Sequence, residues 1–198
     1  MEASRDPESK LVAGTSVRAL GHLVERLETT DADLRGELQE ALRGELLSAK
    51  DDSRAIDVVD AIGNTGDEGF ARELGLRLAA PAPSMREHAA RAFRKMAPAA
   101  ATPALLERLR VEGDPGVRVA IVETLLALGV RDPDAMALAA TLVGTEGSPA
   151  VRAALIRWLG AAAELPVARA GLVAQFHREQ VPQLLQLIGR YVSADELK

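Results

Sequence analysis

Apolar and polar positions in the stretch from Asp114 to Gly129 follow the period of one amphipathic helix. Val117, Ile121 and Leu125 recur every four residues, so they share one helical face. Asp114 is suited to cap the N-terminus of this helix, and the proline and glycine that follow it open the first turn. Gly129 is suited to end the helix. The stretch therefore predicts one capped helix that is followed by a turn.

Degraded copies of this stretch recur along nearly the whole chain. The dipeptides that open the helix bodies are separated by 34, 34, 32 and 34 residues, and each is followed by an apolar helical face. These dipeptides are Val17-Arg18, Asp51-Asp52, Met85-Arg86, Val117-Arg118 and Val151-Arg152. We call the helices that they open the first-set helices.

A second, less uniform set of helices is predicted between them, each after turn or capping residues. These second-set helices are expected over residues 33–49, 67–79, 133–143 and 166–176, with one more that is capped by Thr102 and has Pro103 at its first position. A final helix is expected over residues 182–192. Because neither helix of a pair can bury its apolar face alone, the pairs must stack.

The period predicts an all-α fold, a right-handed α-solenoid of about five helix-turn-helix repeats, each of about 34 residues. No linker longer than a turn interrupts it, so we expect one repeat domain over residues 11–192. Residues 1–10 are charged and aperiodic and are expected to form a flexible leader, and residues 193–198 a polar tail.

Composition agrees with a helical fold and narrows the function classes. Hydrophobic residues make up 47% of the 198 residues, aromatic residues only 3%, and the net charge is −5, which argues against nonspecific binding of nucleic acid. The chain has no cysteine, so disulfides and zinc thiolate sites are excluded. No signal peptide or apolar span is found, so a cytoplasmic location is expected. Abundant alanine, with arginine far outnumbering lysine, is typical of a high-GC bacterial genome.

Two motifs resemble the HEAT-type helical repeats, especially the bacterial ones related to phycobilisome lyases. Residues 147–155, Gly-Ser-Pro-Ala-Val-Arg-Ala-Ala-Leu, and residues 114–120 resemble the Asp-Pro-x-Val-Arg-x-x-Ala opening of that family. Residues 61–67, Ala-Ile-Gly-Asn-Thr-Gly-Asp, resemble its turn between helices. The resemblance covers residues 51–192 and implies the HEAT-type architecture, while family members include adaptors, scaffolds, lyase subunits and DNA-repair enzymes.

The most regular polar feature is a structural arginine ladder of Arg18, Arg86, Arg118 and Arg152. An arginine at the start of each first-set helix can bind an acidic side chain or free carbonyl groups of the neighbouring repeat. The alternative is a row that binds phosphate or carboxylate ligands, but Asp52 would reverse its charge in the second repeat. We therefore interpret the ladder as structural.

Motifs for catalysis, metals and cofactors are missing from the sequence. The three histidines lack metal-site spacing, and no nucleophile elbow, phosphate loop or dinucleotide glycine pattern is found. No catalytic residue, cofactor or metal ligand is predicted. The only tryptophan, Trp158, falls on an apolar face and is expected in the core. Residues 135–143 carry no charge, so their helix is expected to be either wholly buried or an apolar patch for a partner.

The resemblance implies that second-set helices line the concave side of the solenoid, where their polar residues become candidates for partner binding. These candidates are Arg72, Glu73, Arg77, Glu107, Arg108, Arg110, Phe176 and Arg178. Their mixed charges suit a protein or peptide better than a nucleic acid, which favours a continuous basic stripe.

The first hypothesis for function is a non-enzymatic scaffold or adaptor for protein-protein interaction that binds a protein or peptide on the concave helix row. An enzyme or enzyme subunit remains the alternative, either a chromophore lyase or a DNA-repair glycosylase built on HEAT repeats. A third interpretation is a module of a larger envelope assembly. The sequence leaves the partner and the oligomeric state open.

Overall fold

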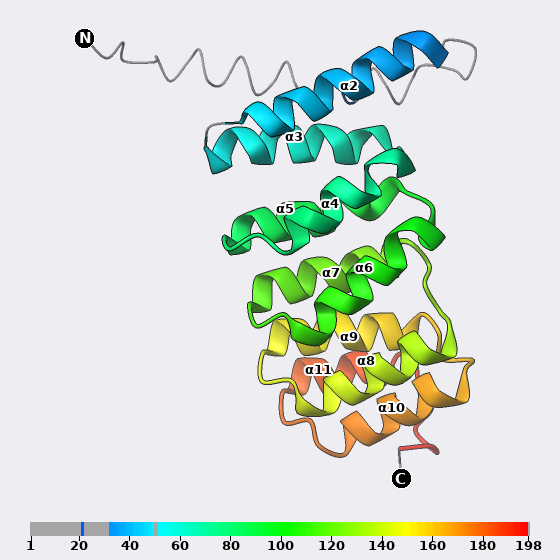
Figure 1. The fold of residues 1–198 in the computed structure, drawn as a ribbon. Helices are drawn as coiled ribbons and strands as arrows, with labels where there is room; N and C mark the ends of the chain where they lie inside the picture. Colours follow the sequence, from blue (N-terminus) through cyan, green and yellow to red (C-terminus); the bar gives the residue numbers. More distant parts are fainter. Residues whose placement is uncertain (1–20, 22–31, 50, 198) are drawn as a thin grey trace. The chain divides into compact units, whose positions relative to one another are not determined.

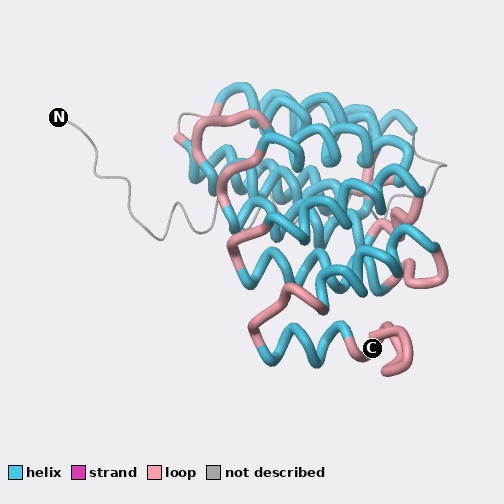
Figure 2. Tube along the Cα trace, turned by 90° about the horizontal axis from the view of Figure 1, so that it is seen from below, coloured by secondary structure: helices cyan, strands magenta, loops and turns pink. Residues whose placement is uncertain are grey.

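The computed structural model describes residue 21, residues 32–49 and residues 51–197. These residues form helices joined by short turns and loops, and no strand occurs among them (Figures 1 and 2). The predicted all-α class is confirmed, and the helices are arranged as an α-solenoid of HEAT-like repeats. The chain divides into two compact units, Met1–Ala101 and Thr102–Lys198.

The first unit alternates second-set and first-set helices, with two short 3-10 turns. In chain order its elements are α2 (Ala32–Ser48), α3 (Asp52–Thr65), η1 (Glu68–Phe70), α4 (Ala71–Leu78), α5 (Pro83–Ala92) and η2 (Phe93–Lys95). Helix α3 packs against both α2 and α5, and α4 packs against α5. Val17 and Arg18, which open the first predicted first-set helix, lie outside the described residues.

Four helices of the second unit alternate first and second set, and a fifth closes the row. They are α7 (Pro115–Ala127), α8 (Pro133–Thr145), α9 (Pro149–Gly160), α10 (Pro166–Phe176) and α11 (Pro182–Ile188). The first-set helix α9 packs between α7 and α11, while α8 packs against α10 (Figure 1). Helix α6 (Pro98–Val111) crosses the boundary between the units.

Proline and aspartate determine where most of these helices begin. Proline occupies the first turn of α5, α7, α8, α9, α10 and α11, where its missing N–H needs no partner. Asp114 caps α7 by accepting the N–H groups of Gly116 and Val117 at 2.9 and 3.1 Å. Gly129 follows α7 with a φ of 69°, which favours glycine. The sequence pattern is sufficient for these boundaries.

The expected start of α6 at Thr102 is wrong. This helix begins at Pro98, and Pro103 lies inside it. Pro98 provides the favourable start, and the run of alanines that follows is strongly helix-forming. Pro103 therefore interrupts the hydrogen bonding of an existing helix and does not open a new one.

The core of the second unit lies where first-set and second-set helices meet. Trp158 is fully buried, as predicted, and its indole Nε1 donates a hydrogen bond to the carbonyl of Val130 at 2.8 Å. Helices α8 and α10 approach closely at Gly171, where an added Cβ would lie 2.7 Å from the Cβ of Ala140. Their small residues permit this approach.

Helix α8 matches neither of the two expectations for residues 135–143. Met136, Ala139 and Val143 are buried, whereas Ala137 and Thr141 on the opposite side are exposed. The exposed side chains are small, so the helix presents no large apolar patch. Alanine occurs at both buried and exposed positions of this helix, so the sequence shows little contrast between the two faces.

Candidate functional site

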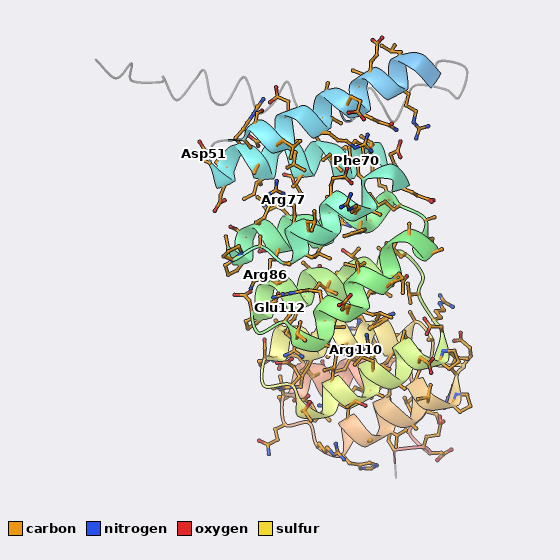
Figure 3. The ribbon with its side chains drawn as sticks, viewed as in Figure 1. Asp51, Phe70, Arg77, Arg86, Arg110 and Glu112 are labelled. Atoms are coloured by element: carbon orange, nitrogen blue, oxygen red, sulfur yellow. The ribbon has the colours of Figure 1, made fainter. Side chains whose placement is uncertain are left out.

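The predicted binding residues of the first unit lie on α4 and differ in their availability. Arg72 is exposed. Glu73 accepts a hydrogen bond from Nε of Arg43 at 2.9 Å. Arg77, which Figure 3 labels, donates from Nη2 to the carbonyl of Leu46 at 3.3 Å. Glu73 and Arg77 thus connect α4 to α2, and Arg72 is the member of this group with no such contact within the described residues.

The predicted residues of α6 show a similar division. Glu107 and Arg110 are exposed, and Figure 3 labels Arg110 on α6. Arg108 forms an ion pair with the buried carboxylate of Glu112, one helical turn along, at 2.7 Å. Arg108 is therefore engaged in an ion pair at the end of α6, while Glu107 and Arg110 are available to a partner.

Phe176 and Arg178 lie at the end of α10. Phe176 is half-buried, and its ring makes an edge contact with the ring of His177, with centroids 5.8 Å apart. Arg178 is exposed, and its guanidinium makes no ion pair or hydrogen bond with the described residues. The candidate residues therefore fall into three groups, on α4, α6 and the end of α10.

Sequence reasoning missed a set of exposed apolar side chains on the second-set helices. Among residues of described burial, the large apolar side chains that are exposed are Leu34 and Leu47 on α2, Leu76 on α4 and Val111 on α6, with exposed fractions of 38%, 85%, 67% and 72%. All four lie on second-set helices. Two of them carry a detectable sequence signal, because Leu76 and Val111 each stand two positions from a buried leucine and so fall off the core face.

Arginines of the ladder contact acidic residues of the next repeat in the second unit. Arg118 on α7 forms an ion pair with Glu146, in the loop before α9. Arg152 on α9 is placed in the same way and binds Glu179, in the loop before α11, with Nε–Oε2 and Nη2–Oε1 distances of 2.8 and 3.0 Å. This is a bidentate pair, the strongest geometry for arginine and carboxylate.

Carbonyl groups provide further acceptors for the ladder arginines. Nη1 of Arg152 donates to the carbonyls of Glu146 and Gly147 at 3.1 and 3.0 Å. Nη1 of Arg86 donates to the carbonyls of Ala80 and Pro81 at 3.0 and 2.7 Å. Each arginine thus binds the loop that precedes its own helix. Arg18 lies outside the described residues.

Three glutamates in the loops before proline-opened helices form a motif that sequence reasoning also missed. Glu112, Glu146 and Glu179 each stand three residues before the proline that opens α7, α9 and α11, respectively. In each, a carboxylate oxygen accepts the backbone N–H two residues later, at 2.9, 2.7 and 3.0 Å. The sequence signal of this motif is a glutamate repeated at intervals of 34 and 33 residues.

The Glu179 carboxyl has a pKa well below its usual range. Burial alone would raise its pKa, but hydrogen bonds from Arg152, from the Val181 N–H and from the Gln175 side chain lower the pKa to about 2. Nε2 of Gln175 donates to Oε2 of Glu179 at 2.8 Å. The carboxylate is therefore ionised at neutral pH and holds the ends of α9, α10 and α11 together.

A cavity of about 210 Å³ lies beside this carboxylate, within the second unit. Its lining comes from the last turn of α8, the loop before α9, the first turn of α9 and the end of α10. The lining residues are Val143, Gly144, Glu146, Arg152, Gln175, Arg178, Glu179 and Gln180. Arg178, one of the predicted binding residues, is thus part of a concave site.

The described part of the chain contains neither a cluster of metal ligands nor a helix that could span a membrane. No group of three or more histidine and acidic residues there could hold a metal ion. Its helices are all too short or too polar to cross a membrane.

Comparison with known families supports the repeat architecture. A family described as HEAT repeats matches residues 71–160, a little under half of the chain. No curated protein and no solved structure matches the sequence. The matched residues run from α4 to the end of α9, so the match extends over parts of both units. HEAT repeats commonly mediate protein-protein interaction and are typically non-catalytic. The bacterial origin and the likeness to phycobilisome lyases stay predictions.

Proposed function

We propose that the protein is a non-enzymatic scaffold or adaptor that binds a protein or peptide through the exposed side chains of its second-set helices. The observation that carries this proposal is the placement of Leu34, Leu47, Leu76 and Val111, because all of these exposed large apolar side chains lie on second-set helices. Exposed apolar surface bordered by polar residues is typical of protein interaction sites.

Charged neighbours support this interpretation in each unit. Leu76 lies one helical turn after Arg72 on α4, and Val111 lies one turn after Glu107 and next to Arg110 on α6. All three charged residues are exposed. A central apolar contact with charges of both signs around it suits a protein surface, since the charges provide specificity and the apolar side chain provides buried area.

Affinity capture from the native lysate, at low and high salt, tests the proposal. The bait is compared with a Leu76→Lys/Val111→Lys variant and with an Ala127→Lys control, which adds a lysine to an exposed position on the first-set helix α7. We expect one protein that is retained at both salt concentrations, lost with the double variant and kept with the control. All three baits must have the same circular dichroism spectrum.

Two results would overturn the proposal. If the double variant and the control retained the same proteins, the second-set helices would not be the binding surface. If the purified protein showed turnover that was lost on substituting one or two polar residues, it would be an enzyme.

A further inference from the structure

Charge balance distinguishes Arg178 from the other charged groups around the cavity of the second unit. The two acidic residues in the lining, Glu146 and Glu179, are each paired with an arginine of the ladder, Arg118 and Arg152. Arg178 then remains as one uncompensated positive charge at the edge of the cavity. An anionic group is therefore the ligand that this site favours.

Gly144 allows Arg178 to take its position against α8. A Cβ at residue 144 would lie only 2.9 Å from Nη1 of Arg178, so the guanidinium occupies space that any other residue would restrict. The arginine lies over the last turn of α8 and extends from the end of α10. The segment after α10 thus places the unpaired cation at the cavity, and Gly144 leaves room for its guanidinium.

Gln175 also lines the cavity and provides a second, independent observation. The residue is 4% exposed, its Nε2 is used by Glu179, and its Oε1 accepts no hydrogen bond from the described residues. The amide cannot be reversed without loss, because its oxygen would then face the Glu179 carboxylate. A buried acceptor without a donor is rare in folded proteins, and a ligand with an N–H next to its anionic group can supply the donor after a small displacement of the amide.

Size narrows the chemical class of the ligand. Sites for drug-sized molecules commonly enclose about 300–1,000 Å³, and this cavity is smaller, at about 210 Å³. One acidic side chain with its adjoining backbone N–H fits both the size and the two polar features. We propose that the cavity binds an acidic residue of a partner peptide, with the carboxylate on Arg178 and the backbone N–H toward Gln175. This inference rests on the proposed function and specifies the chemistry of the partner.

Nuclear magnetic resonance titration with a defined peptide tests the inference. The probe is N-acetyl-(Glu-Ala)3-amide, and the matched neutral peptide is N-acetyl-(Gln-Ala)3-amide. We expect the glutamate peptide to shift the backbone resonances of Gly144 and Arg178 and the side-chain amide of Gln175, and the glutamine peptide to leave them unchanged. The Arg178→Ala variant should bind at least about tenfold more weakly, because a hydrogen bond to a charged group is lost.

Arg190→Ala is the control variant, because Arg190 is also exposed in the second unit and its side chain makes no contact of this kind with the described residues. It should bind the glutamate peptide as the wild type does. Equal weakening by both variants, equal shifts with sodium acetate at the same carboxylate concentration, or no shift at these residues would each overturn the inference. If the peptide failed while capture still depended on Leu76 and Val111, the proposed function would stand and only this inference would fall.

Discussion

Replacing Glu179 with glutamine should lower the stability of the second unit in a pH-dependent way. The carboxylate is 1% exposed and accepts two hydrogen bonds from Arg152. The Glu179→Gln variant removes the negative charge and leaves Arg152 without its counterion, while the side-chain volume hardly changes. Loss of one partner from a buried ion pair is strongly destabilising.

The lowered pKa gives the magnitude. Each pKa difference of one corresponds to about 1.4 kcal/mol. The change in pKa from 4.5 to about 2 then corresponds to about 3 kcal/mol of stability from the ionised carboxylate. Because the folded-state pKa is below the unfolded one, this stability is fully present above pH 4.5 and is lost as the pH falls toward 2.

Urea denaturation at pH 7 and at pH 3, followed by tryptophan fluorescence, measures this effect. Trp158 is the only tryptophan and lies buried in the same unit as Glu179, so its signal reports that unit even if the repeats unfold separately. We expect the variant to be less stable by about 3 kcal/mol at pH 7. At pH 3 the wild type should already have lost about 2 kcal/mol of this contribution, so the difference should fall to about 1 kcal/mol.

Glu123→Gln is the matched control, because the Glu123 carboxylate and its partner Arg157 are both exposed and 3.4 Å apart. This variant should change stability by less than about 0.5 kcal/mol at either pH. The reasoning would be refuted if Glu179→Gln cost less than about 1 kcal/mol at pH 7 or cost the same at both pH values.

Two further predictions concern helix packing and helix caps, and urea denaturation followed by circular dichroism checks both. Gly171→Ala should lower the free energy of unfolding by about 1–3 kcal/mol because the new Cβ would overlap Ala140. Gly75→Ala, with open space around its Cβ, should raise it by about 0.5–1 kcal/mol. Effects of the same sign for the two variants would contradict the packing argument. Asp114→Ala should cost about 1 kcal/mol because a cap with two hydrogen bonds is lost, whereas Ser148→Ala should be nearly neutral because the Ser148 side chain makes no cap hydrogen bond. Equal costs for these last two variants would contradict the cap argument.

Most helix starts in this fold can be predicted from local sequence signals. Asp114 and the prolines that open the first-set helices act within one helical turn, so their effect is readable without knowledge of distant contacts. The same local reasoning failed at Pro103, because a proline after several helix-forming alanines can lie inside a helix as well as open one. The single repeat domain expected over residues 11–192 stays a prediction.

The candidate site was only partly predictable. Arg72, Arg110 and Arg178 follow from helical phase, and they are exposed. Helical phase could not reveal that Arg108 forms an ion pair with Glu112, because several rotamers of a long side chain fit the same helical position. Nor could it show that Arg178 lies against Gly144, since that contact joins two helices.

The sequence by itself determined the helical class, the period and most helix starts, because each depends on residues within a turn of one another. The tertiary structure alone decided which charges are compensated. Arg152 meets Glu179 across 27 residues of chain, and this pair leaves Arg178 as the uncompensated charge beside the cavity. Such contacts depend on how neighbouring helices pack, as where Gly171 on α10 lies close against Ala140 on α8.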